Sequence, residues 1–148
     1  MLIKKEERGK RKNEMETRNN VTERVFVGRG TVELRERTRS YALRIIKLYS
    51  SLPKTTLAQV MGKQILRSGT SVGAQYREAN RAKSDADFVS KLEGALQELD
   101  ESAYWLELLE DAQIVEAQRL QNLTEETAQL LKVLVTIVDR VKHRTNSK

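Results

Sequence analysis

Hydrophobic side chains recur with the 3.6-residue period of an α-helix over most of this chain. The first periodic run begins at Val32 and ends at Pro53. Its apolar positions fall on one helix face: Leu34, Tyr41, Ile45, Leu48 and Leu52. Because proline disfavours helical backbone at the residue before it, the run predicts a helix that ends just before Pro53.

A second helix is expected from Thr55 or Thr56, either of which can cap it, to about Asn80. Its stripe is thin and includes a small residue: Leu57, Met61, Ile65, Ser68 and Val72. The helix also contains Gly69 and Gly73, each of which costs about 1 kcal/mol relative to alanine. Such glycines favour close approach of a neighbouring helix, either within one chain or at a subunit interface.

The third helix has the clearest period in the sequence. Ser84 followed by Asp87 resembles a capping box just before the run. The apolar stripe then continues for six turns: Phe88, Leu92, Ala95, Leu99, Leu106 and Leu109. These signals predict a helix that starts after Ser84 and ends where the pattern breaks, near residues 111–114.

A fourth helix is expected from Gln118 to Lys142. Residues 130–138, with Leu134 at their centre, are apolar around most of the helix circumference. A lone bundle needs one buried face per helix, so we interpret this breadth as burial against another subunit.

Four helices with short connections predict an all-α fold, an antiparallel up-down-up-down four-helix bundle over residues 31–148. Residues 1–30 are polar and aperiodic, and we expect a mostly disordered basic extension. No cysteine is present, which excludes disulfides and thiolate metal sites. With no signal-peptide pattern and no apolar run near 20 residues, the expected protein is soluble and cytoplasmic.

The formal charge of +6 is distributed unevenly. Residues 1–30 carry nine Lys or Arg against five Glu, including the consecutive Lys10, Arg11 and Lys12. Both a solvated arm and a nucleic-acid contact fit this composition.

The second and third predicted helices have opposite charge. The basic residues of the second helix and its exit include four candidates for nucleic-acid binding: Arg67, Arg77, Arg81 and Lys83. From Phe88 to Asp111, the third helix has seven Asp or Glu and only one Lys. The alternative interpretation is that the two helices simply pair, in the bundle or between subunits.

Two further sets of polar or aromatic residues point to an interface. Arg67 and Glu78 share a helix face, so with Gln75 and Tyr76 they are expected to form a polar network there. Tyr104 and Trp105 offer either a stacking surface for a base or interface packing.

The sequence shows no combination of residues that is typical of an active site. The single histidine, His143, cannot supply the two Glu-x-x-His pairs of a di-metal bundle site. We interpret the acidic cluster on the third helix as a solvated face: Glu98, Asp100, Glu101 and Glu107. Ser68 and Ser71 have no suitable base nearby in the sequence pattern. We therefore expect a protein that is not an enzyme. It should bind no metal ion, cofactor or small-molecule substrate and should not associate with a membrane.

The region from Gln64 to Leu109 resembles the bacterial "four helix bundle protein" family, also called the 23S rRNA intervening-sequence (S23) protein family. The resemblance rests on five segments: residues 67–79, 81–84, 87–88, 91–92 and 104–109. The surrounding helices extend it to roughly residues 32–142, and one departure is Gln75, where the family usually has asparagine.

The resemblance implies a left-handed bundle that assembles as a homopentamer, with Gly69, Gly73, Tyr76, Glu78, Trp105 and Leu134 as candidate packing or interface residues. Relatives include the accessory variability determinant of diversity-generating retroelements, which works with a reverse transcriptase and its RNA. The sequence thus supports two hypotheses. One is a non-enzymatic oligomer that binds structured RNA, DNA or a nucleic-acid enzyme. The other is a protein-interaction scaffold with no nucleic-acid role.

Overall fold

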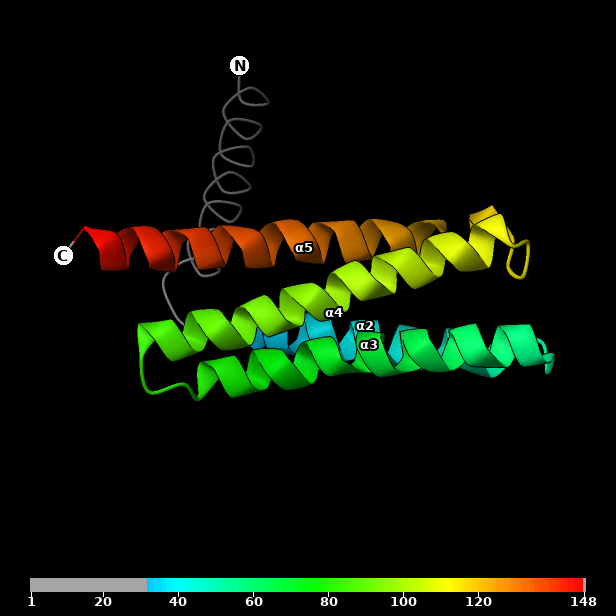
Figure 1. Cartoon of the computed structure of the whole chain (residues 1–148), viewed down its shortest axis with the longest axis horizontal. Coiled ribbons are helices and arrows are strands. Elements are labelled where there is room, and N and C mark those ends of the chain that lie inside the picture. Colours follow the sequence, from blue (N-terminus) through cyan, green and yellow to red (C-terminus); the bar gives the residue numbers. More distant parts are fainter. Residues whose placement is uncertain (1–31, 148) are drawn as a thin grey trace, which may run out of the picture.

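The computed structural model describes residues 32–147. They form four helices in this order: α2 (Val32–Ser51), α3 (Thr56–Asn80), α4 (Asp85–Asp111) and α5 (Ala117–Asn146). Successive helices run in opposite directions and pack side by side, with α4 tilted across the bundle (Figure 1). The predicted all-α, up-down-up-down bundle is confirmed. The predicted basic extension, including Lys10, Arg11 and Lys12, lies outside the described residues.

Side-chain caps fix the start of two helices where the sequence predicted them. The Thr55 hydroxyl accepts a hydrogen bond from the Ala58 amide at 3.3 Å, so Thr55 is the cap of α3. The Ser84 hydroxyl likewise accepts from the Asp87 amide at 3.0 Å and caps α4. Both caps satisfy amides that have no partner inside the helix.

The turn between α4 and α5 has a left-handed residue. Gln113 has a φ of 57°, and its amide donates to the Glu110 carbonyl at 2.9 Å. The Ile114 amide reaches back to the Leu109 carbonyl at 3.0 Å. This is the Schellman arrangement, in which glycine usually occupies the left-handed position.

The core contains nearly all the predicted apolar residues. The stripes of α2 and α4 are buried as expected, and Met61, Ile65 and Val72 of α3 are buried with them. Leu57 is the exception, because its side chain is 58% exposed. Ala58 is fully buried instead, and a neighbouring position on a helix points about 100° away.

The glycines of α3 all face α2 of the same chain. A Cβ added at Gly69 would lie 2.6 Å from Ile45 Cγ1, and one at Gly73 would lie 3.2 Å from Thr38 Oγ1. Gly62, which the sequence analysis did not select, would meet Leu52 at 2.6 Å. Of the two alternatives for these glycines, the structure therefore shows close approach inside the bundle.

Helix α5 buries most of its broad apolar surface within one chain. Leu134 is completely buried, Val138 is 4% exposed, and Leu131 and Val133 are partly buried against the core. Val135 remains 43% exposed. Packing inside the chain thus buries most of the apolar surface of residues 130–138 that we interpreted as a contact with another subunit.

A buried layer of hydroxyl groups crosses the bundle, with one member from each helix. Tyr41 of α2 and Thr127 of α5 have their oxygens 2.7 Å apart, and Ser68 of α3 and Ser102 of α4 lie 2.8 Å apart. All four side chains are at most 1% exposed. Burial raises the pKa of Tyr41, and hydrogen bonds with Thr127 and Ser102 partly oppose that shift.

Candidate nucleic-acid interface

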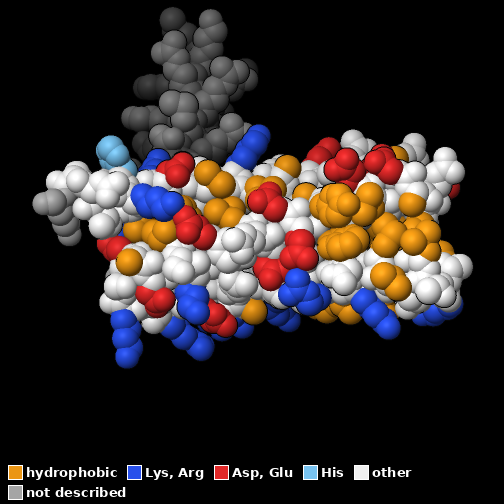
Figure 2. Space-filling model, in the orientation of Figure 1, with side chains coloured by type: hydrophobic (Ala, Val, Ile, Leu, Met, Phe, Trp, Pro, Cys, Tyr) orange, Lys and Arg blue, Asp and Glu red, His pale blue; other side chains and the backbone are white. Residues whose placement is uncertain are grey.

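Charge is segregated between the helices. Helix α4 carries nine Asp or Glu and one Lys, whereas α2 carries five Lys or Arg and two Glu. In Figure 2, Lys and Arg side chains project along the lower edge, where α3 runs, and acidic side chains lie above them. We therefore call the edge along which α3 runs the basic side of the described bundle, and the surface of α4 its acidic side.

Among the candidates for nucleic-acid binding on α3 and its exit, Arg67 pairs with acidic residues of α4. Its guanidinium lies 3.7 Å from a Glu98 oxygen and 3.2 Å from a Glu101 oxygen, both on α4. The side chain is still 60% exposed, so these pairs are weak, but both acids compete with any phosphate for the same cation. Arg67 thus serves α3–α4 pairing, which was the alternative interpretation for this residue.

Glu98 is the most perturbed carboxyl at this contact. Its side chain is 13% exposed, and Oε2 is buried with no hydrogen-bond partner in the described chain. Burial raises the pKa of Glu98, while Arg67 opposes the shift and Glu101 adds to it. The result is a destabilised carboxylate beside a partly exposed arginine.

Within the described chain, Arg67 and Glu78 pair with α4 and not with each other. Glu78 instead lies 3.7 Å from Lys91 of α4, with both side chains well exposed. Gln75 packs against Gly94, and Tyr76 is fully buried in the core. Each of these residues faces α4 or the core at a different level of the helix, so the network at a subunit interface stays a prediction.

Arg77, Arg81 and Lys83 remain as candidates. Arg81 and Lys83 are exposed in the connection between α3 and α4, and Arg77 is half-buried one turn earlier. None of the three forms an ion pair with a residue in the range 32–147. They form a basic group at one end of α3.

Aromatic and aliphatic side chains are exposed on the neighbouring helices α3 and α4. Tyr104 is 55% exposed beside Trp105, with ring centroids 5.4 Å apart. Leu57 and Val60 are 58% and 55% exposed on α3, which runs antiparallel to α4 here. Figure 2 shows hydrophobic side chains gathered over this end of the bundle. We call Leu57, Val60, Tyr104 and Trp105 the α3–α4 apolar patch.

The burial of Trp105 determines which aromatic ring of the α3–α4 apolar patch is open to a partner. Its indole Nε1 is buried and has no hydrogen-bond partner among the described residues. Tyr104, next to it, is the more accessible ring. The indole packs against the core, so Tyr104 offers the larger exposed surface for stacking or for a protein contact.

Three cations between α2 and α5 are not among the candidates predicted from the sequence. Arg44 and Lys47 of α2 and Arg119 of α5 line a hollow between these helices. The charge count of α2 and the three-residue spacing of Arg44 and Lys47 were available signals. That Arg119 lies opposite them depends on how α5 packs.

Two further properties of the described residues concern a metal site and a membrane span. Between residues 32 and 147, no group of three His, Asp or Glu side chains is placed to hold a metal ion. None of helices α2 to α5 is both long and apolar enough to cross a lipid bilayer.

Comparison with known proteins identifies the family. The family model described as "23S rRNA-intervening sequence protein" matches residues 31–136. A solved structure from Bacteroides thetaiotaomicron, a protein of unknown function from the S23 ribosomal protein family, has 40% sequence identity and a TM-score of 0.67. The match covers 71% of this chain and 94% of that one. No curated protein matches this chain.

Proposed function

This chain belongs to the 23S rRNA-intervening sequence protein family, and we propose that it is a non-enzymatic oligomer that binds structured RNA or DNA through its basic side. The observation that carries the proposal is the group Arg77, Arg81 and Lys83. These cations gain no ion pair inside the described fold, whereas Arg67 does. Because these cations have no carboxylate partner in the described chain and lie on its basic side, they can bind the phosphate groups of a nucleic acid.

Oligomerisation is part of the same proposal. The α3–α4 apolar patch is flanked by acidic α4, and the edge of the bundle along which α3 runs is basic. A contact between the acidic side of one copy and the basic side of the next is heterologous, and such contacts form a ring when the rotation between successive copies closes. A homopentamer would have a mass of about 85 kDa, five times the 17.0 kDa chain, and a net charge of about +30.

Mass measurement by light scattering tests the assembly. The wild-type protein should elute as a species of about 85 kDa. Leu57→Asp with Tyr104→Asp changes exposed positions only, so the helices should still fold while the mass falls to that of a monomer. A wild-type protein that is monomeric at micromolar concentration contradicts the oligomer.

Fluorescence anisotropy tests nucleic-acid binding. The full chain is titrated into a labelled RNA hairpin and a labelled DNA duplex at 50 and 200 mM salt. Binding should weaken by about 1,000-fold or more if six or more phosphates are contacted, because neutralising phosphates releases counterions. No binding to either probe at 50 mM salt would overturn the proposal.

Charge-matched variants locate the contact. Arg77→Gln, Arg81→Gln and Lys83→Gln together should weaken binding more than Lys54→Gln, Lys63→Gln and Lys132→Gln, which remove the same charge from exposed positions. Lys10→Gln, Arg11→Gln and Lys12→Gln in the full chain measure the contribution of the N-terminal cluster.

The second candidate is a protein-interaction scaffold. The exposed α3–α4 apolar patch and the pairing of Arg67 with Glu98 and Glu101 favour it. A scaffold predicts loss of assembly in the Leu57→Asp and Tyr104→Asp variant, with no salt-dependent binding to either nucleic acid.

A further inference from the structure

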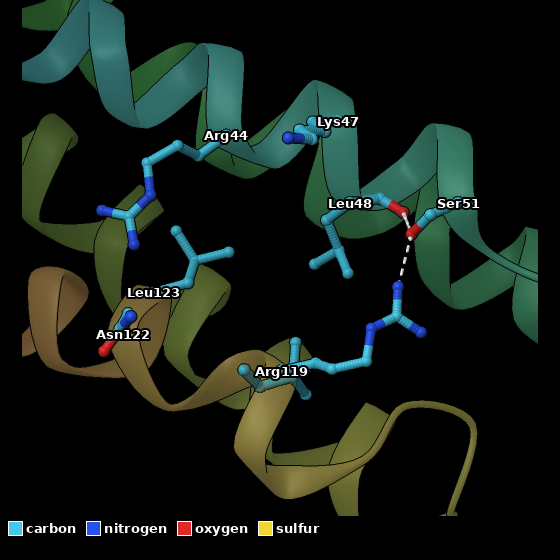
Figure 3. Close-up of a pocket in the computed structure, with 8 residues that line it drawn as sticks. Arg44, Lys47, Leu48, Ser51, Arg119, Asn122 and Leu123 are labelled. Carbon is cyan, nitrogen blue, oxygen red and sulfur yellow. Dashed lines mark hydrogen bonds between the residues drawn. The ribbon is translucent and has the colours of Figure 1, made fainter.

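A hollow of about 330 Å³ lies between α2 and α5, where α2 ends and α5 begins. Figure 3 shows the guanidinium groups of Arg44 and Arg119 extending into the space between the two helices, from opposite sides. Lys47 is on α2, three residues from Arg44 and on the same side of that helix. We call this hollow the α2–α5 groove.

The groove has a polar rim and an apolar floor. Its rim residues are exposed: Arg44, Lys47, Ser51, Arg119 and Asn122. Leu48, Leu120 and Leu123 are buried beneath them. A ligand seated here meets cations and hydrogen-bonding groups at its edges.

The cations of the groove are poorly compensated. Glu126 accepts a hydrogen bond at Oε1 from Arg37 Nε at 2.9 Å, and Arg44 lies 4.0 Å from its other oxygen, Oε2. Arg119 donates to the Ser51 hydroxyl at 3.4 Å, the long end of hydrogen bonding. Lys47 has no ion pair with any residue that the structure describes.

Arg119 also occupies a position that disfavours a cation. It lies in the first turn of α5, where the helix dipole is positive and no acidic residue is present. Thr55 and Ser84 cap α3 and α4 through their side chains, but Glu116 makes no such bond at α5. Positive charge from Arg44, Lys47 and Arg119 therefore accumulates here with only weak compensation from the fold.

We propose that the α2–α5 groove binds consecutive phosphates of a nucleic-acid backbone. The inference rests on the proposed function and adds a second surface to it, which shares no residue with the group Arg77, Arg81 and Lys83. Arg44 to Ser51 spans about 10 Å of helix at 1.5 Å per residue. One strand of a duplex carries a phosphate every 3.4 Å along its axis, so about three phosphates face the three cations.

The test compares three full-length variants in the anisotropy titration with the DNA duplex. Arg44→Gln, Lys47→Gln and Arg119→Gln form the groove variant. Lys54→Gln, Lys63→Gln and Lys132→Gln form the charge-matched control, all at exposed positions outside the groove. Arg44→Lys, Lys47→Arg and Arg119→Lys preserve the charge of the groove.

The groove variant should bind about tenfold or more weakly than the control at 50 mM salt. Its slope of log K against log salt should be smaller in magnitude than that of wild type by about 2.7, or 0.9 for each phosphate contact. The charge-preserving variant should keep the wild-type slope. Thermal unfolding of the groove variant should occur close to the wild-type temperature, because the contacts of its cations with Glu126 and Ser51 are long and exposed.

Two results overturn the inference and are distinguishable from failure of the proposed function. If wild type binds and the groove variant keeps the slope of the control, the groove is not the site, and binding lies elsewhere. If the charge-preserving variant loses as much affinity as the groove variant, the loss comes from altered folding. Absence of wild-type binding at 50 mM salt overturns both proposals.

Discussion

Gly69 of α3 lies so close to Ile45 of α2 that a methyl group on Gly69 would meet Ile45 Cγ1 at 2.6 Å. Ile45 is completely buried, so its side chain has little room to move. The contact explains why a helix interior retains a residue that costs about 1 kcal/mol in propensity.

Gly69→Ala should destabilise the protein by about 1 kcal/mol. Overpacking a core costs about 1–3 kcal/mol, which exceeds the propensity gain of about 1 kcal/mol. Gly94→Ala is the matched comparison, because the added methyl would meet only the flexible end of the Gln75 side chain. Urea unfolding should show a lower midpoint for Gly69→Ala and an equal or higher one for Gly94→Ala. The reverse order would contradict the packing argument.

Gln113→Gly should stabilise the protein by about 1 kcal/mol. Gln113 has a φ of 57°, and a side chain in this left-handed conformation costs about 1–2 kcal/mol, of which the greater flexibility of unfolded glycine returns part. Differential scanning calorimetry should show a higher Tm. Gln113→Ala is the control and should not raise it, because alanine also carries a Cβ. A lower Tm for Gln113→Gly would show that the turn does not hold this strain.

Glu98→Gln should stabilise the protein at pH 7 more than at pH 5. Burial raises the pKa of Glu98 in the folded state above the ordinary value of 4.5, so the folded carboxyl takes up a proton before the unfolded one as pH falls. The cost of the ionised carboxylate is therefore fully present above the folded pKa and disappears below 4.5. Glutamine removes that cost at all pH values.

Urea unfolding at the two pH values checks the Glu98 prediction. Arg67→Gln provides the second arm, since it removes the cation that opposes the shift and should lower stability at pH 7. Equal effects of Glu98→Gln at pH 5 and pH 7 would rule out the raised pKa.

Tyr41→Phe should cost about 1 kcal/mol, the usual net value of one hydrogen bond. Thr127 donates to the Leu123 carbonyl at 2.8 Å, so the Tyr41 hydroxyl is the donor in the 2.7 Å contact between the two. A double-mutant cycle with Thr127→Val measures their coupling. The coupling energy should be positive and of the same order, and a value near zero would show that the pair is not bonded in solution.

The hydrophobic period determined the helices and the core because both depend on residues close together in the chain. Leu34, Phe88 and Leu99 are buried where their spacing predicted, and Ser84 caps the helix that follows it. The prediction that Leu57 is buried was wrong because the first turn of α3 is compatible with two helical registers that differ by one residue.

Tertiary structure alone decided which charges remain available. Arg67 and Arg77 are ten residues apart on the same basic helix, and nothing local to the sequence separates them. Two carboxylates of α4 pair with Arg67, whereas Arg77 has no ion pair with a described residue. The α2–α5 groove likewise joins Lys47 to Arg119, which are 72 positions apart, because helix packing brings them together. Periodicity is a local property and fixes the bundle, but ion pairs and grooves depend on the level at which antiparallel helices meet.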